Sequence, residues 1–196
     1  MGLLEVKFQP EINIAQANPG SSWFRRDRGR TYASTAECDK ALIKLVTRTS
    51  APDDYYVSAG TADFVVPWLQ RLYRCAEISR GPTPKIRRLI FKCLSAELTE
   101  VLLVNKMIAQ KFKERLEVNL RAISEDSLIR SHGVEIEVRR WNRLPPFHGH
   151  MFGENLIIGP WSIDSTGLLH AQTPVTHFRG RLIKEELNNT QKMFLD

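Results

Sequence analysis

Two histidines separated by one residue are the part of this sequence whose types and spacing best suit chemistry. They lie in the segment Phe147-His148-Gly149-His150. On a β-strand, residues i and i+2 point to the same face, so both imidazoles can address one phosphoryl group. One ring can attack or take a proton while the other stabilises charge. We therefore predict that His148 and His150 are catalytic residues.

The same pair allows two other interpretations. Both rings could bind a metal from one face of the strand. A third ligand would then come from Glu154, Asp164, His170 or His177. Nothing in the sequence fixes the spacing of these candidates, so we predict neither a metal nor a cofactor. The other possibility is structural, with both rings partly buried and their N–H groups bonded to loop carbonyls.

Basic charge favours an anionic partner. The chain of 196 residues carries a formal net charge of +6 and has a pI of about 9.4. Near the N-terminus, Trp23 and Phe24 precede a cluster of arginines, and aromatic and guanidinium groups together can stack bases and pair with phosphates. We predict that nucleic acid binds Arg25, Arg26, Arg28, Arg139, Trp141, Asn155 and Ser162. The arginine cluster could equally be a solvated loop.

The composition is that of a globular protein, with 42% hydrophobic and 26% charged residues. We predict an N-terminal arm over residues 1–33 and one domain over residues 34–196. Cys38, Cys75 and Cys93 have no disulfide or zinc spacing. The first residues lack a signal-peptide pattern, and no apolar run is long enough to span a bilayer. We therefore expect a cytoplasmic protein with no membrane span.

Hydrophobic periodicity indicates alternating helices and strands. The earliest expected strand covers residues 4–8, and a helix follows the capping residues 34–37. Further strands are expected at 55–60, 86–94, 134–141, 148–152, 156–159 and 175–178. Helices are expected at 61–78, at 96–130 as two helices broken near 106–113, and at 181–194, while residues 160–173 read as a loop. This order predicts an α/β fold, a mixed sheet flanked by helices on both faces.

The histidine motif and its surroundings resemble the phospholipase D-like superfamily. The signature of that superfamily is a histidine, any residue and a lysine, with an aspartate five residues beyond the lysine and then a Gly-Ser-x-Asn stretch. His148 stands at the nucleophile position, His150 at the lysine position and Asn155 at the aspartate position. Gly159-Pro160-Trp161-Ser162 occupies the Gly-Ser-x-Asn stretch. The agreement of specific residues is confined to 147–164.

The resemblance implies a function and an assembly. Enzymes of the superfamily combine two motifs, so a chain with one motif would act as a homodimer. One histidine forms a phosphohistidine and the other protonates the leaving group. Here His150 replaces a fixed cation, and Pro160 and Ser162 replace phosphate donors. We expect a phosphodiesterase or nuclease, or a degenerate relative that serves as a nucleic-acid-binding or protein-interaction subunit of a larger complex.

Overall fold

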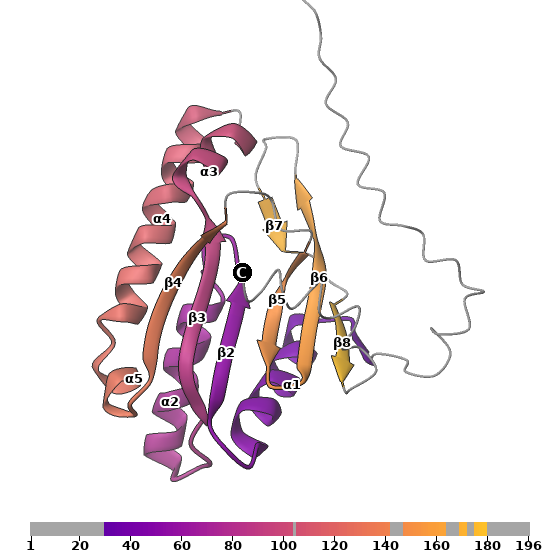
Figure 1. The fold of residues 1–196 in the computed structure, drawn as a ribbon, viewed down its shortest axis with the longest axis vertical. Coiled ribbons are helices and arrows are strands. Elements are labelled where there is room, and N and C mark those ends of the chain that lie inside the picture. Colours follow the sequence, from indigo (N-terminus) through magenta and orange to yellow (C-terminus); the bar gives the residue numbers. More distant parts are fainter. Residues whose placement is uncertain (1–29, 104, 142–146, 164–168, 172–174, 180–196) are drawn as a thin grey trace, which may run out of the picture.

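A mixed β-sheet organises the computed structural model, which describes residues 30–103, 105–141, 147–163, 169–171 and 175–179. The strands run in the order β1 (Arg30–Tyr32), β8 (Val175–Arg179), β6 (Asn155–Ile163), β5 (Phe147–Phe152), β2 (Asp53–Ser58), β3 (Ile86–Leu94) and β4 (Glu135–Trp141) (Figure 1). Outside this path, β7 (Leu169–Ala171) pairs with β6. The α/β class predicted from the sequence is therefore confirmed.

Strands and helices alternate from β1 to β3, and three helices lie between β3 and β4. The helices are α1 (Thr35–Arg48), α2 (Val65–Ser79), α3 (Ala96–Leu102), α4 (Lys106–Ser124) and α5 (Ser127–Ser131).

The sheet has a parallel half and an antiparallel half. β2, β3 and β4 are parallel neighbours, joined through helices. β5, β6, β8 and β1 pair antiparallel in turn, and β5 joins the two halves by pairing antiparallel with β2. Connection length explains the division, because parallel neighbours require long crossovers whereas the two-residue turn at Gly153-Glu154 forces β5 and β6 antiparallel. The β2–β5 boundary is where the carboxyl end of β2 meets the histidine strand.

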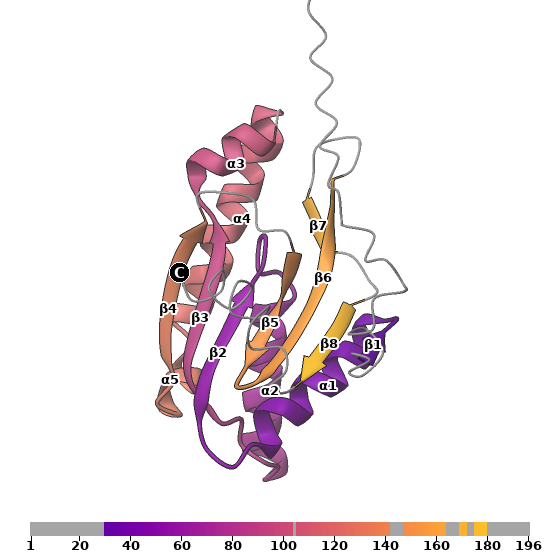
Figure 2. The ribbon, with the colours of Figure 1, turned by 45° about the vertical axis from the view of Figure 1, so that its right-hand side comes forward.

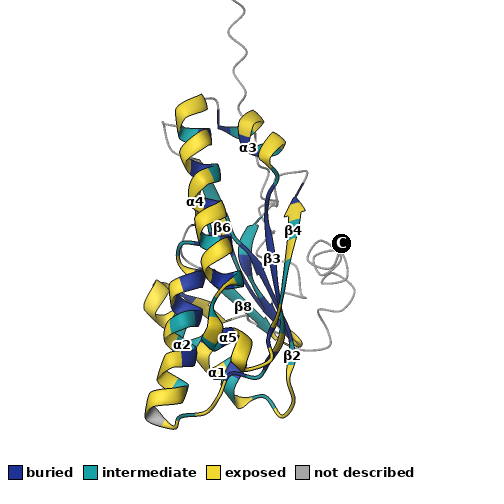
Figure 3. Cartoon of the chain, turned by 90° about the vertical axis from the view of Figure 1, so that its left-hand side faces the viewer, coloured by how far each residue is buried: buried dark blue, intermediate teal, exposed yellow. Residues whose placement is uncertain are grey.

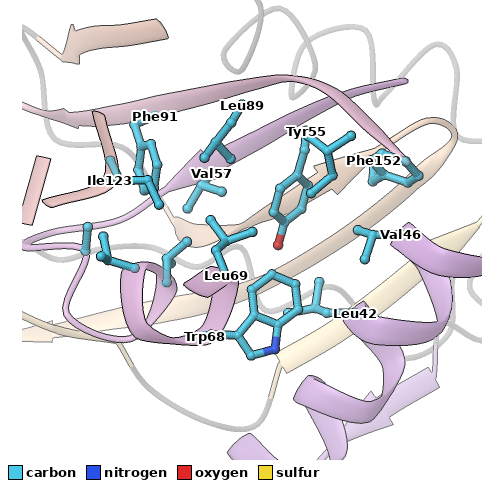
Figure 4. Packing of buried hydrophobic residues seen from close by; sticks show 14 of the residues in the cluster. Leu42, Val46, Tyr55, Val57, Trp68, Leu69, Leu89, Phe91, Ile123 and Phe152 are labelled. Carbon is cyan, nitrogen blue, oxygen red and sulfur yellow. The ribbon is translucent and has the colours of Figure 1, made fainter. Parts of the chain in front are cut away.

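The described helices cover one face of this sheet. Figure 3 shows them on one side of the strands, with their buried residues turned inward. Leu42 of α1, Leu69 of α2 and Ile123 of α4 share one core with Tyr55 and Phe91 of the central strands (Figure 4). The helix expected at 181–194 lies outside the described residues, as does the strand expected at 4–8.

Several elements begin or end elsewhere than the sequence predicts, and three helices, α3 to α5, stand where two were expected. α2 begins at Val65 and not at Thr61, which places Pro67 in the first turn, where proline is tolerated because its missing N–H has no intrahelical acceptor. α4 already begins at Lys106, so the expected break does not lie within 106–113; Asn105 accepts hydrogen bonds from the amides of Met107 and Ile108 as the N-cap.

The expected loop over residues 160–173 is wrong in its first and later parts. β6 continues through Pro160 to Ile163, and Leu169–Ala171 pairs with it as β7. Pro160 stands opposite Phe147, the first described residue of β5, and is exposed, a position at which a strand tolerates proline.

The sheet begins earlier than residue 34. β1 lies within the residues expected to form the N-terminal arm, and it pairs with β8 at one edge, beside α1 (Figure 2). Among the described helices, none combines the length and the hydropathy required to cross a membrane.

Candidate functional site

A cavity of about 350 Å³ opens where the two halves of the sheet meet. Its walls come from the carboxyl end of β2 and the residues after it, from α1 and α2, and from strands β5 to β8. The residues that line it are Thr35, Cys38, Ser58, Ala59, Gly60, Thr61, Ala62, Asp63, Phe64, Val65, His148, Gly149, His150, Ile157, Trp161, His170 and Val175. Three histidines therefore share one cavity, including both that the sequence singled out.

Gly149 sets the position of the two β5 histidines. His148 and His150 point to one face of β5, as the spacing predicts, and both line the cavity. A Cβ at Gly149 would overlap the carbonyl oxygen of Ile157 and lie 2.9 Å from Ile158 Cγ2. Glycine between the histidines thus permits the close approach of β5 to β6.

His150 is paired with a buried tyrosine. The Tyr55 hydroxyl lies 2.8 Å from His150 Nδ1, and the two rings stack with their centroids 5.9 Å apart and their planes 13° apart. Burial lowers the pKa of His150 to about 3, with a smaller contribution from the neighbouring His148. Burial also raises the pKa of Tyr55 well above its ordinary value. His150 is thus a neutral imidazole beside a protonated phenol.

His148 and His170 also line the cavity, each beside a different neighbour. The His148 ring meets Trp161 of β6 edge to face, with centroids 5.2 Å apart. His170 is exposed and belongs to β7, whose pairing with β6 places it opposite Ser162. The unexpected strand β7 is therefore the element that adds the third histidine.

The segment after β2 is anchored by α4. Asn119 donates to the carbonyl of Thr61 at 2.7 Å and to Asp63 Oδ1 at 2.8 Å, and Arg115 donates to the same oxygen at 2.6 Å. The Thr61 hydroxyl donates to the other carboxylate oxygen. Burial alone would raise the pKa of Asp63, but these hydrogen bonds and the guanidinium outweigh it and hold the pKa below its usual range. Asp63 is thus an ionised anchor at the cavity wall.

Cys38 brings a thiol to the cavity from the first helix. Its side chain is buried, and that burial, with a smaller contribution from Asp39, raises its pKa to about 11. The thiolate is the nucleophilic form of cysteine, so Cys38 is poorly suited to covalent catalysis. Cys38 therefore contributes to the cavity as one of the residues that line it.

The structure separates the predicted Asn155 and Ser162 contacts from the cavity wall. Asn155 opens β6 opposite Phe152, whereas His148 lies opposite Gly159, four residues further along and about 13 Å away at the usual rise of a strand. Asn155 Oδ1 instead faces His177 Nε2 at 3.1 Å. Ser162 sits on β6 opposite His170 and does not line the cavity.

Arg139 lies on the opposite face of the sheet from the histidines. Arg139 of β4 stands opposite Lys92 of β3, and this register puts both side chains on the face of the sheet opposite His150. Arg139 donates to Glu137 Oε1 at 2.6 Å. Trp141 is buried at the end of β4 and packs against the Lys92 ammonium, 4.3 Å from its ring centroid. Arg25, Arg26 and Arg28 lie outside the described residues.

Within the described part of the chain, no group of three or more histidine, cysteine or acidic side chains is arranged to hold a metal ion. The metal interpretation had required such a third ligand. Asp164, one of its candidates, lies outside the described residues.

Sequence reasoning missed the wall that β2 and α2 supply. Ser58-Ala59-Gly60-Thr61 begins with the last residue of a buried strand and precedes a helix, and ligand sites of α/β sheets commonly lie at such carboxyl ends of strands. That run of small residues was a usable signal. The contribution of Tyr55 had no local signal, because its partner lies 95 residues away in the sequence.

No protein-family model matches the chain, and no curated protein matches it at a significant level.

Proposed function

We propose that this chain is a phospholipase D-like protein that binds a phosphodiester, preferably of nucleic acid, in the histidine cavity and hydrolyses it. The observation that carries the proposal is the presence of His148, His150 and His170 in the wall of one cavity. The chain order supports it as well, since a strand, the histidine motif, a hairpin and an Ile-Ile-Gly strand follow one another as the resemblance implies.

In the proposed reaction His148 of one copy attacks phosphorus. The bond from phosphorus to the leaving oxygen breaks, and His148 of a second copy donates the proton that this oxygen needs. Water then attacks the phosphohistidine and gives its proton back to the second histidine, so that one phosphodiester and one water become a phosphomonoester and an alcohol. Two copies supply the two histidines, which makes the active form a homodimer.

A second candidate function is binding without cleavage. The pKa of His150 is about 3, so this residue carries no charge at neutral pH where the resembled superfamily carries a lysine. Among the described residues that line the cavity there is no lysine or arginine. The negative charge that develops on the phosphoryl group in the transition state would then be stabilised by fewer cations than in an enzyme of the superfamily. Weaker stabilisation slows cleavage and favours a regulatory subunit that binds nucleic acid.

Hydrolysis assays separate the two candidates. Purified full-length chain would be incubated with single-stranded DNA, duplex DNA, RNA and a chromogenic phosphodiester. His148→Ala should lower the rate by roughly 100-fold or more, the usual contribution of such a group. His132→Gln, a substitution of an exposed histidine outside the cavity, is the matched control.

Activity that survives His148→Ala would contradict the proposed mechanism. Binding without turnover, weakened by His148→Ala and not by His132→Gln, would support the second candidate.

A further inference from the structure

Tyrosine and histidine form the same cross-strand pair twice in the described structure. Tyr55 and His150 are diagonal neighbours on β2 and β5, since Val57, two residues after Tyr55, stands opposite His150. Tyr32 and His177 are diagonal neighbours on β1 and β8, since Arg30 stands opposite His177. In both pairs the hydroxyl faces Nδ1, at 2.8 Å and 3.0 Å, and the rings stack about 6 Å apart.

The second pair reveals which ring nitrogen carries the proton. Asn155 Nδ2 donates to the carbonyl of Phe152, so its Oδ1 is the atom that faces His177 Nε2 at 3.1 Å. Because this oxygen can only accept, Nε2 must carry the proton. Nδ1 of the neutral ring is then an acceptor, and the Tyr32 hydroxyl donates to it.

The first pair has the same geometry but ends differently. The buried Tyr55 phenol keeps its proton and faces His150 Nδ1. Nε2 lies on the other side of the ring, and within the described residues no side chain or backbone group is hydrogen-bonded to it. His177 has Asn155 as the partner of its Nε2 atom, whereas His150 lines the cavity.

We propose that Tyr55 is a positioning residue that holds His150 in the neutral Nε2–H form, as a fixed hydrogen-bond donor for a phosphoryl oxygen in the cavity. This inference rests on the proposed function for its ligand. It also divides the roles of the two β5 histidines. The Nδ1 lone pair of His150 is used by Tyr55 and its Nε2 carries a proton, so His150 has no free lone pair with which to attack phosphorus. Attack belongs to His148.

The protonation of His150 can be measured without any ligand. In uniformly ¹⁵N-histidine-labelled full-length protein, long-range ¹H–¹⁵N spectra distinguish a ring protonated at Nε2 from one protonated at Nδ1, and His150→Gln identifies the signals of His150 by their loss. We expect the Nε2–H form in the wild type and a mixture of both forms in Tyr55→Phe, which keeps the ring but lacks the donor. A wild-type His150 protonated at Nδ1, or an unchanged form in Tyr55→Phe, would overturn the inference.

Binding of a phosphodiester provides the second readout. Tyr55→Phe should weaken it by roughly 10- to 100-fold, the loss seen when outer partners of metal-binding histidines are removed. Tyr32→Phe is the matched control, because it removes the hydroxyl of the equivalent pair outside the cavity wall, and it should change the spectrum of His177 but not binding. Equal losses in both variants would contradict the positioning role.

The two proposals fail in different ways. If no phosphodiester binds the wild type while the His150 spectrum responds to Tyr55→Phe as expected, the proposed function fails and the positioning of His150 stands as a property of the ring alone.

Discussion

His150 makes the free energy of unfolding depend on pH. Burial lowers its pKa to about 3, whereas an unfolded chain binds this proton near the ordinary value of about 6.5. Between these values the unfolded state binds more protons. The contribution of His150 to stability is therefore complete above about pH 6.5 and is lost as the pH falls toward 3, by up to about 1.4 kcal/mol per pH unit.

Urea unfolding at about pH 7 and about pH 4 measures this loss. His150→Gln, which cannot titrate, should show a smaller fall in unfolding free energy over the same interval. Equal falls in the variant and the wild type would show that other groups cause the acid sensitivity. His177 is one such group, because burial also lowers its pKa.

Substitution of Gly149 tests the close packing of β5 against β6, which positions the two histidines. We expect Gly149→Ala to destabilise the protein by about 1–3 kcal/mol or more, since the added methyl overlaps the Ile157 carbonyl. Gly81→Ala is the matched control, because its Cβ would meet nothing within 4 Å, and it should change stability by less than about 0.5 kcal/mol. Thermal and urea unfolding would measure both, and similar effects at the two positions would contradict the close approach of β5 to β6.

At the scale of elements, side chains of α4 anchor the segment after β2, which lines the cavity. Asn119→Ala removes both hydrogen bonds to the segment after β2, and we expect a loss of about 1–3 kcal/mol in stability together with weaker phosphodiester binding. Asn105→Ala removes the N-cap of the same helix and should cost about 1 kcal/mol without changing binding. Calorimetric titration compares the two variants, and equal binding losses would show that α4 matters only for overall stability.

The sequence predicts the elements better than their ends. Local pattern alone locates β3 and β4, because β3 is an apolar run whose last six residues are buried and β4 alternates apolar and polar residues. Pro160 misleads, since proline usually ends a strand, yet β6 continues beyond it to Ile163. The sequence contains Asn105, the N-cap of α4, but the apolar pattern over 96–130 places the break a few residues later, near 106–113.

The candidate site is only half predictable for a similar reason. A spacing of two places His148 and His150 on one face of any strand, so this part follows from local geometry. Tyr55 and His170 reach the cavity through pairings of β5 with β2 and of β6 with β7. Such pairings join residues far apart in the chain, and no local pattern specifies them.

At the scale of the whole molecule, charge should govern association with nucleic acid. The formal net charge is +6, from 28 basic and 22 acidic residues. Each phosphate contact contributes about 0.9 to the slope of log affinity against log salt for duplex DNA. Replacing Arg25, Arg26 and Arg28 together by alanine should therefore reduce the slope by up to about 2.7. Fluorescence anisotropy at several salt concentrations measures it, and an unchanged slope would remove these arginines from the interface.

The sheet also separates two chemical environments. The histidine cavity lies on the face covered by the described helices, while Arg139 and the paired carboxylates and guanidiniums around Asp54 occupy the other face. A long polyanion that contacted both would have to pass an edge of the sheet. Variants of Arg139 and of His148 should therefore affect binding independently.

The rate at which Cys38 is alkylated should report whether a ligand fills the cavity. Its thiol lines the cavity and is buried, with a pKa raised to about 11, whereas Cys75 is exposed on α2 and Cys93 is buried in β3. A small alkylating reagent should consume Cys75 quickly and Cys38 slowly, and a bound ligand should slow only the second reaction. Mass spectrometry of the modified peptides would then report, residue by residue, when the cavity is filled, before any substrate has been identified.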